Sequence, residues 1–268
     1  MLLNEIIKHK EEEIRLRKKQ FSLAFLEEEI SLRESYCSFE EALLKPGKRV
    51  KLIAEIKKAS PAKGVLKKNF NPLDIAKSYE EYGADCLSVL TDEKYFQGDI
   101  DHLQQIRTFV ALPILRKDFI IEEYQIKESA ACGADAILLI ASVLSEDKIK
   151  KFLKLCERLK MTALVETHTQ DDVKKALNAG ACIIGINNRN LDTLQINLDV
   201  SEKLVELIPK DKIIVSESGI KSGSEVEWLE AIGVNAILVG ESLMTSKNLK
   251  EKIDDLMSIN DKTAKVLG

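Results

Sequence analysis

The sequence predicts an α/β fold, a (β/α)8 (TIM) barrel with an N-terminal helical extension. From residue 50 onward, short apolar runs alternate with helix-like segments, a pattern typical of βαβ units and a parallel sheet. There are eight such runs, and one glycine-containing element recurs four times. Eight strands built from a fourfold repeat of two βα units are the expected signature of such a barrel.

The first 48 residues read as helix without strand. Leu3, Ile6, Ile7 and Ile14 form a broken apolar stripe among lysines and glutamates, which predicts an amphipathic extension packed on the main body. The basic run at 15–19 is expected to be a solvated helix face. We therefore expect one domain over residues 1–268, with the extension at 1–48 and the barrel at 49–268.

The eight strands and the helices between them can be located by their apolar periodicity. The predicted strands are 52–56, 86–90, 112–116, 136–141, 162–166, 182–187, 213–216 and 235–239. The predicted helices lie near 71–83, 100–109, 122–132, 146–159, 169–179, 199–207, 222–232 and 247–258.

The repeated element decides the strand count. Its glycines are Gly83, Gly133, Gly180 and Gly233, spaced by 50, 47 and 53 residues, the length of two βα units. Each reads as a helix that ends at a glycine C-cap and turns directly into an even-numbered strand. A doubly wound open sheet is the alternative, but it usually has fewer strands and no quarter-repeat. No dinucleotide-binding Gly-x-Gly-x-x-Gly follows the first strand.

Composition excludes several classes of protein. The 40 basic and 44 acidic residues are well mixed, unlike the concentrated basic face of a nucleic-acid binder. No apolar run approaches the roughly 18 residues that span a bilayer. The five cysteines contain no Cys-x-x-Cys pair and make a poor disulfide or zinc framework. We expect a soluble, cytoplasmic, reduced protein, a monomer or weak homodimer, with neither nucleic-acid nor membrane partners.

Glu55 and Lys57 conflict with the apolar strand that contains them. They are two residues apart and so lie on one face of that strand. Such a pair is costly unless it forms a buried ion pair or faces a wet cavity, and the segment alone does not separate these two interpretations. Polar residues also follow most of the other strands, at the end where barrels carry their active sites.

One group of these strand-end residues suits a phosphate. Gly219 follows the seventh strand, and Gly240 and Glu241 follow the eighth, where barrels bind phosphate through backbone amides. Arg189 and Ser60 can add hydrogen bonds. We expect the backbone amide of Glu241, and not its carboxylate, to face the anion. Two ordinary glycine turns are the alternative.

A second group suits acid–base chemistry. Lysines and carboxylates that converge in one mouth shift one another's pKa and can supply a general acid and a general base. The group is Glu55, Lys57, Lys117, Glu166, Asn187 and Glu217. With no metal cluster, catalytic triad or cofactor motif, the chemistry would depend on protonation alone. Lys117 and Asp118 could instead form a local ion pair, and His168 is expected to be a loop residue or a minor contact.

Seven motifs in this order resemble the indole-3-glycerol-phosphate synthase family, from the N-terminal extension to the last helix. They are Glu-Ile-Lys-x-x-Ser-Pro-x-x-Gly (55–64), Leu-Thr-Asp-x-x-Tyr-Phe-x-Gly (90–98), Leu-Arg-Lys-Asp-Phe (115–119), Val-Glu (165–166), Gly-Ile-Asn-Asn-Arg-Asn-Leu (185–191), Ser-Glu-Ser-Gly-Ile (216–220) and Gly-Glu-Ser-Leu-Met (240–244). Two departures are small: Ala62 stands where serine is commoner, and Asn190 where aspartate is frequent.

The resemblance implies a carboxy-lyase of tryptophan biosynthesis that works without a metal or cofactor. Its substrate, 1-(2-carboxyphenylamino)-1-deoxyribulose 5-phosphate, would lose carbon dioxide and water to give indole-3-glycerol phosphate. By this resemblance Lys117 is the general acid, Glu166 the partner in later proton transfers, and Lys57 the group that holds the departing carboxylate. The remaining residues that line and orient the reacting end are Glu55, Asn187, Glu217 and Ser218.

The same resemblance divides the rest of the site. The phosphate would be bound by Ser60, Arg189, Gly219, Gly240 and Glu241, and the anthranilate ring flanked by Phe96, Phe119 and Leu138. The loop with Lys63 and Gly64 is expected to close over the substrate. One alternative is another phosphate-sugar barrel such as phosphoribosylanthranilate isomerase, which would need an Asp/Cys acid–base pair. The other is a non-catalytic ligand-binding barrel, which should have lost Lys117 or Glu166.

Overall fold

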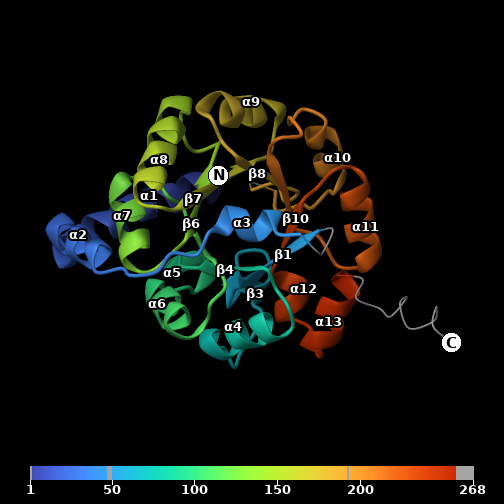
Figure 1. The fold of residues 1–268 in the computed structure, drawn as a ribbon, viewed down its shortest axis with the longest axis horizontal. Helices are drawn as coiled ribbons and strands as arrows, with labels where there is room; N and C mark the ends of the chain where they lie inside the picture. The colour runs from blue at the N-terminus through green and yellow to red at the C-terminus, as the bar shows by residue number, and fades with distance from the viewer. Residues whose placement is uncertain (1, 47–49, 192, 258–268) are drawn as a thin grey trace.

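The computed structural model describes residues 2–46, 50–191 and 193–257, and its centre is a closed barrel of eight parallel strands (Figure 1). Around the barrel the strands run in the order β1, β10, β9, β8, β7, β6, β5, β4 and back to β1. Their bounds are Lys51–Ile56 (β1), Cys86–Leu90 (β4), Ile114–Lys117 (β5), Ala136–Ile140 (β6), Thr162–Thr167 (β7), Ile183–Asn187 (β8), Ile213–Glu217 (β9) and Ala236–Val239 (β10). The predicted (β/α)8 fold is confirmed.

Eight helices follow the strands and surround the barrel (Figure 1). They are α4 (Pro72–Glu81), α6 (Ile100–Phe109), α7 (Glu123–Ala131), α8 (Glu146–Arg158), α9 (Gln170–Ala179), α10 (Asp199–Val205), α11 (Gly223–Ala231) and α13 (Leu249–Leu256). The strand-end loops also contain two short helices and a hairpin that the periodicity did not predict, α5 (Glu93–Phe96), α12 (Glu241–Met244) and β2–β3 (Ala59–Ser60 with Gly64–Val65).

The four repeated glycines lie at helix ends, as predicted. All four glycines have positive φ, from 86° at Gly83 to 104° at Gly233, a conformation that side chains disfavour. Gly180 is itself the C-cap of its helix, and the other three glycines directly follow the C-cap residue. Each leads within a few residues into β4, β6, β8 or β10. The predicted strand boundaries agree with the structure within one residue, except that β5 begins at Ile114 and not at residue 112. Pro113 lies just before it and has no N–H to give to the ladder.

Strand alternation sorts side chains between the barrel interior and the surrounding helices. On β1, Leu52, Ala54 and Ile56 belong to the core beneath the helices, whereas Ile53 packs in the interior with residues of the other strands. Glu55 follows Ile53 with the same parity and therefore points inward, above the apolar layer. The polar end of the barrel is thus a continuation of its interior rows.

The N-terminal helices reach both ends of the barrel. In α1 (Leu2–Gln20), Leu2, Leu3 and Ile6 lie at the carboxyl ends of the strands. After α2 (Leu23–Ser31), the Cys37 amide donates to Asp135, just before β6, so α3 (Phe39–Leu44) lies at the opposite end (Figure 1). The predicted packing of the extension is confirmed.

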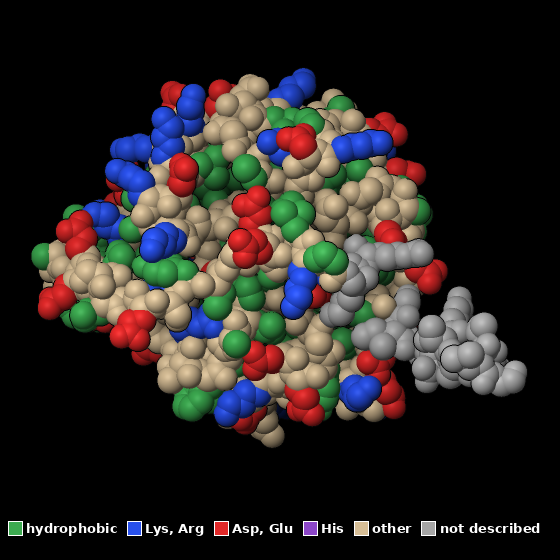
Figure 2. Space-filling model, in the orientation of Figure 1, with side chains coloured by type: hydrophobic (Ala, Val, Ile, Leu, Met, Phe, Trp, Pro, Cys, Tyr) green, Lys and Arg blue, Asp and Glu red, His purple; other side chains and the backbone are tan. Residues whose placement is uncertain are grey.

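The basic run of α1 is only partly a solvated face. Arg17 donates to Glu128 of α7 at 2.8 Å and its side chain is 23% exposed, whereas Arg15 remains exposed. Acidic and basic side chains are interspersed on the face in Figure 2, with Lys and Arg most frequent over α8. Within the described ranges, no helix is long and apolar enough to cross a membrane.

Candidate active site

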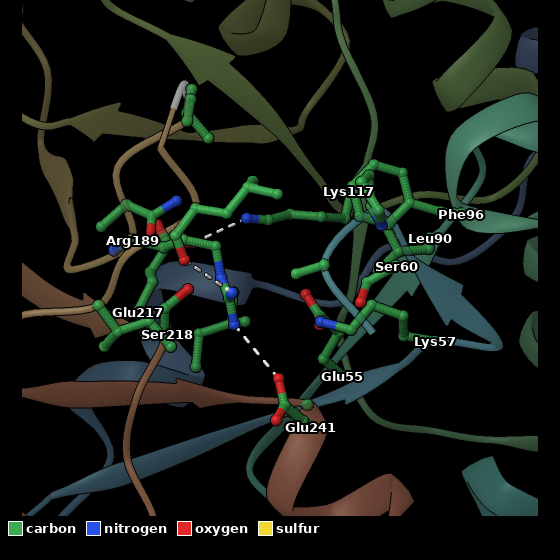
Figure 3. Close-up of a pocket in the computed structure, with 18 of the residues that line it drawn as sticks. Glu55, Lys57, Ser60, Leu90, Phe96, Lys117, Arg189, Glu217, Ser218 and Glu241 are labelled. Atoms are coloured by element: carbon green, nitrogen blue, oxygen red, sulfur yellow. Dashed lines mark hydrogen bonds and ion pairs between the residues drawn. The ribbon is translucent and has the colours of Figure 1, made fainter. Parts of the chain in front are cut away.

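A cavity of about 370 Å³ opens at the carboxyl ends of the barrel strands (Figure 3). Every residue that the sequence suggested for the site lies in its lining: Glu55, Lys57, Ser60, Phe96, Lys117, Phe119, Leu138, Glu166, Asn187, Arg189, Glu217, Ser218, Gly219, Gly240 and Glu241. They come from all eight strands or the loops that follow them, so the fold brings the whole set together.

Inward rows of the strands build the floor of this cavity. Lys117 follows Leu115 on β5, and Glu166 follows Leu164 on β7; both leucines pack in the barrel interior. Because side chains alternate along a strand, the last inward residue of each strand projects above the apolar layer. Charged groups thereby stand on an apolar base, where electrostatic interactions are stronger than in water.

Glu55 and Lys57 satisfy both interpretations left open by the sequence. Their side chains form an ion pair, and both line the cavity. A Cβ at residue 240 would lie 2.2 Å from Oε1 of Glu55. Any side chain at residue 240 would therefore have to displace the Glu55 carboxylate.

Lys117 is the centre of the charged group. Its Nζ lies 2.7 Å from Oε2 of Glu217 and 3.1 Å from Oε2 of Glu166. Burial alone would lower the pKa of Lys117, but Glu217, Glu166 and Glu55 outweigh burial and raise it above its usual value. The alternative of a local Lys117–Asp118 ion pair is wrong, because Asp118 pairs with Lys10 and Arg116 on the outside of the barrel.

The two carboxylates beside Lys117 differ in pKa. Burial raises the pKa of Glu217 to about 7, with Lys117 opposing the shift and Glu166 adding to it. Burial acts in the same direction on Glu166, but the charges of Lys117 and His168 and hydrogen bonds from Lys117 and Asn187 lower its pKa. Carboxylates whose pKa values are pushed apart can take different acid–base roles. The lowered pKa favours the ionised form of Glu166 at neutral pH.

Backbone and amide contacts fix the neighbouring residues. Oδ1 of Asn187 accepts a hydrogen bond from the Arg189 backbone amide at 3.0 Å. The Asn187 side chain also forms a hydrogen bond with Glu166. Asn188 was not among the predicted site residues. Its buried amide donates to the carbonyls of Glu217 and Ser218 and so holds the turn after β9. Two consecutive asparagines at the end of an apolar strand were the available signal.

Ser218 carries backbone strain at the mouth. Its φ is +68°, followed by +87° at Gly219, and a non-glycine residue in this region costs about 1–3 kcal/mol. A Cβ at residue 219 would lie 2.4 Å from Cγ2 of Ile196. The strand-end glycine predicted for phosphate binding is thus also required by the loop that packs against it.

Gly185 is a second site residue that sequence reasoning missed. It lies on β8, and a Cβ there would meet Oε1 of Glu217 at 2.3 Å. This buried carboxylate oxygen has no hydrogen-bond partner within the described residues, so it is held against the bare backbone of β8. A glycine inside an apolar strand marks a close approach of this kind.

Gly185→Ala is expected to displace the Glu217 carboxylate from Lys117. We expect a loss of about ten- to a hundredfold in kcat/KM, since small displacements of reacting groups are costly, and about 1–3 kcal/mol of overpacking strain. Gly180→Ala, after α9, is the control. Its methyl would meet nothing within 4 Å, so it should lose stability through its positive φ but keep its kinetics. Wild-type kinetics in Gly185→Ala would contradict this steric role.

The predicted phosphate end is closed by ion pairs. Nη2 of Arg189 lies 3.2 Å from Oε2 of Glu241, and Nζ of Lys63 lies 3.8 Å from Oε1 (Figure 3). The Glu241 carboxylate therefore joins the β2–β3 hairpin to the loop after β8. An incoming anion would compete with Glu241 for Arg189.

The opposite end of the cavity is apolar. The rings of Phe96 and Phe119 lie 6.3 Å apart at an interplanar angle of 39°, and Leu138 is buried beside them. The extension adds Leu2, Leu3 and Ile6 to this wall. Their apolar stripe had been interpreted only as packing. His168 lies near the acid–base group, with Nε2 3.6 Å from Oε1 of Glu166.

Comparisons with known proteins show the family of this chain. The family model described as "Indole-3-glycerol phosphate synthase" matches residues 3–256. The indole-3-glycerol phosphate synthase of Endomicrobium trichonymphae is 46% identical over 96% of this chain and 99% of its own. That of Campylobacter curvus is 43% identical, also over 96% and 99%.

Solved structures share the fold at low identity. A 3-hexulose-6-phosphate synthase from Salmonella typhimurium superposes with a TM-score of 0.61 at 12% identity, covering 78% of this chain and 98% of that one. A chain of the tryptophan synthase complex from Pyrococcus furiosus gives 0.58 at 14%, covering 79% and 98%. The family match over nearly all of the sequence goes further: this chain belongs to the indole-3-glycerol phosphate synthase family.

Proposed function

We propose that this protein converts 1-(2-carboxyphenylamino)-1-deoxyribulose 5-phosphate into indole-3-glycerol phosphate, carbon dioxide and water. The observation that carries the proposal is the arrangement of Lys117 between Glu166 and Glu217. It stands in a cavity with an apolar end at Phe96 and Phe119 and a cationic end at Arg189. A substrate with an aromatic ring at one end and a phosphate at the other matches that polarity.

Ring closure needs an acid at the ketone. Lys117 is charged at neutral pH because the neighbouring carboxylates raise its pKa, so it can donate a proton to the carbonyl oxygen. The ring carbon that bears the carboxylate attacks the carbonyl carbon. The bond to the carboxylate then breaks, and its electrons restore the aromatic ring as carbon dioxide leaves. Lys57 compensates the carboxylate charge before that step.

Dehydration follows at the same carbon. The new hydroxyl leaves as water after accepting a proton, with Lys57 or Lys117 as donor, and a base removes a proton to complete the indole. Glu166 is assigned as this base, because its pKa is lowered and it is ionised at neutral pH. A positioned acid or base typically contributes about a hundred- to ten-thousandfold.

The two ends of the substrate orient the reaction. Arg189, Ser60 and the backbone at Gly219, Gly240 and Glu241 would bind the phosphate, and the ring would lie against Phe96, Phe119 and Leu138. The β2–β3 hairpin is tied to Glu241 through Lys63. Phosphate binding at Arg189 would release Glu241 and allow the hairpin to rearrange over the substrate.

Arg189→Ala is expected to raise KM by about ten- to a hundredfold, since a charged hydrogen bond is worth about 1.5–3 kcal/mol. Competitive inhibition by inorganic phosphate should weaken by a similar factor. Arg158→Ala, on the exposed last turn of α8, is the matched control. An unchanged KM in Arg189→Ala would remove Arg189 from the phosphate site.

The raised pKa of Glu217 predicts a pH-dependent stability. Between its ordinary value of 4.5 and about 7, the folded protein binds more protons at this group than the unfolded chain does. Its contribution to stability must therefore fall as pH rises through that window. In urea unfolding, the free energy of wild type minus that of Glu217→Gln should decrease from pH 5 to pH 8. A difference that does not change with pH would contradict the raised pKa.

Direct assay tests the proposed function. Purified protein is mixed with the carboxyphenylamino-deoxyribulose phosphate, and indole-3-glycerol phosphate is followed by its fluorescence while released carbon dioxide is measured in parallel. Equal amounts of both products are expected. Substrate left unchanged by folded protein would refute the proposal, and release of carbon dioxide without the indole would refute the assignment of the dehydration step.

A further inference from the structure

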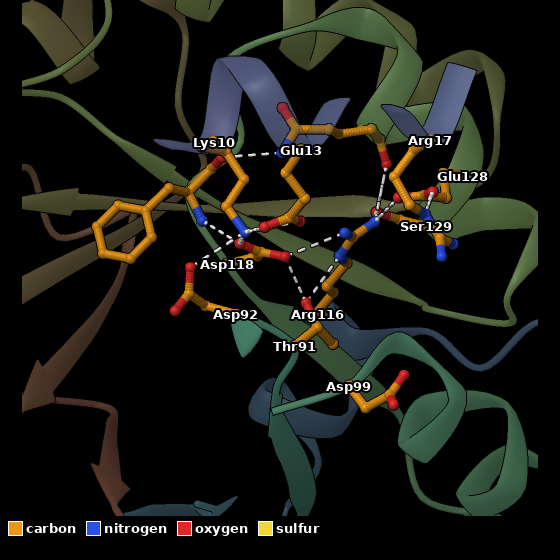
Figure 4. Close-up of polar contacts among 12 residues, drawn as sticks. Lys10, Glu13, Arg17, Thr91, Asp92, Asp99, Arg116, Asp118, Glu128 and Ser129 are labelled. Carbon is orange, nitrogen blue, oxygen red and sulfur yellow. Dashed lines mark hydrogen bonds and ion pairs between the residues drawn. The ribbon is translucent and has the colours of Figure 1, made fainter. Parts of the chain in front are cut away.

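Lys10 is a charged residue in the interior of the protein. It lies on α1, its side chain is 0% exposed, and its Nζ contacts three carboxylates, at 2.9 Å (Glu13), 3.1 Å (Asp92) and 2.9 Å (Asp118) (Figure 4). Burial alone would lower the pKa of Lys10, but these carboxylates raise it above its usual value. Lys10 is therefore an ammonium ion at neutral pH. Burying an ion costs several kcal/mol before pairing repays it.

Asp118 connects Lys10 to the cavity through β5. Its Oδ1 accepts from the Phe119 amide at 2.8 Å, and its Oδ2 accepts from Thr91 and from Arg116 at 3.0 Å. Asp118 stands between Lys117, which points inward, and Phe119, which lines the apolar end. The orientation of its carboxylate thus sets where the chain turns after β5.

Asp92 connects Lys10 to the neighbouring loop. Its Oδ1 accepts from the Tyr95 amide at 2.8 Å and caps α5, while its carbonyl accepts from the Gly98 amide at 2.8 Å. Phe96 is the last residue of this one-turn helix. The second carboxylate held by Lys10 therefore fixes the loop that carries the other aromatic ring.

We propose that Lys10 is a positioning residue that holds Phe96 and Phe119 together as the aromatic-ring subsite. One ammonium ion bridges the carboxylates that anchor the two ring-bearing loops after β4 and β5. The phosphate end is built from Ser60 on β2 and from the loops after β8, β9 and β10. Among the described residues, Lys10 forms its ion pairs with Glu13, Asp92 and Asp118 and with none of the residues of that end. This inference rests on the proposed function, because it assigns the substrate's ring to this end of the cavity.

The geometry predicts a loss confined to one end of the substrate. Lys10→Met keeps the aliphatic stem and removes the charge, so Asp92 and Asp118 lose their common partner. We expect KM for the substrate and the dissociation constant of free anthranilate to rise by about tenfold or more, since small displacements in a site are costly. The dissociation constant of inorganic phosphate should stay within about twofold, because that end does not depend on Lys10.

The test uses the full-length protein and two ligand fragments. Anthranilate and inorganic phosphate are titrated separately into wild type, Lys10→Met and Lys18→Met, and KM and kcat are measured on the same samples. Lys18 lies on α1 with 43% of its side chain exposed and pairs with Glu122, so its variant controls for loss of a lysine from this helix. The proposal would be overturned if Lys10→Met weakened the binding of both fragments equally, or weakened the binding of neither.

A second variant keeps the test valid if Lys10→Met does not fold. Asp92→Asn retains an oxygen for the Tyr95 amide but loses the ion pair with Lys10. This variant should raise KM and the dissociation constant of anthranilate and leave the dissociation constant of phosphate unchanged. An unchanged dissociation constant of anthranilate would count against the proposed role of Lys10. Failure of the proposed function would be distinguished by wild type itself, which would then not turn over the substrate.

Discussion

Replacement of Lys117 by methionine is expected to reduce kcat by about a thousandfold or more, within the range for a positioned general acid. Methionine fills a similar volume but cannot donate a proton or neutralise Glu166 and Glu217. The two carboxylates would then take up protons at higher pH, because each loses its nearest cation. Fluorescence of the indole product measures the loss, and thermal unfolding verifies that the variant is folded.

The control for Lys117 is a surface lysine treated in the same way. Lys174→Met, on α9, removes an amine that is 69% exposed and should leave kcat unchanged. Full activity in Lys117→Met would eliminate the assigned mechanism even if the protein proved to make indole-3-glycerol phosphate. Strong but incomplete loss with carbon dioxide still released would move the role of Lys117 to dehydration.

Glu166→Gln is expected to cause the next largest loss, about a hundredfold in kcat, with KM little changed. Glutamine keeps the size and the contact with Asn187 but cannot accept a proton. Lys117 would keep its 2.7 Å contact with Glu217, so the ring-closing acid should remain in place. Single-turnover experiments should therefore show an intermediate that has lost carbon dioxide but has not yet become the indole.

Glu157→Gln, exposed on α8, serves as the control for Glu166. If Glu166→Gln releases carbon dioxide and water at the wild-type rate, the base lies elsewhere. Glu217 would be the next candidate, because it shares Lys117 and has a pKa near neutrality. The double variant would then be expected to lose activity that neither single variant loses.

Much of the fold was predictable because local pattern and tertiary structure agree. Gly83, Gly133, Gly180 and Gly233 combine a left-handed C-cap with an entry into a strand, and this element is visible in the sequence. Glu55 and Lys117 could be placed in the cavity because strand alternation fixes which face they share. The charged and phosphate-binding residues could be predicted because they follow the strand ends, whereas Phe96, Phe119 and Leu138 were predicted only from the family resemblance.

Other parts were hidden because they depend on contacts between distant elements. Lys10 looks like any lysine of an amphipathic helix, and it is buried only because α1 packs beside the loops after β4 and β5, where it meets Asp92 and Asp118. Gly185 reads as one small residue in an apolar strand until Glu217 on β9 lies against it. The burial of Lys10 and the approach of Glu217 to Gly185 both depend on residues far away in the sequence.

A crystal structure with indole-3-glycerol phosphate bound would test most directly the claim that one cavity binds both ends of the substrate. The phosphate is predicted at Arg189 and the backbone of Gly219 and Gly240, with the indole ring against Phe96 and Phe119 and near Lys117. A phosphate at the aromatic end, or a ligand outside this cavity, would contradict the account.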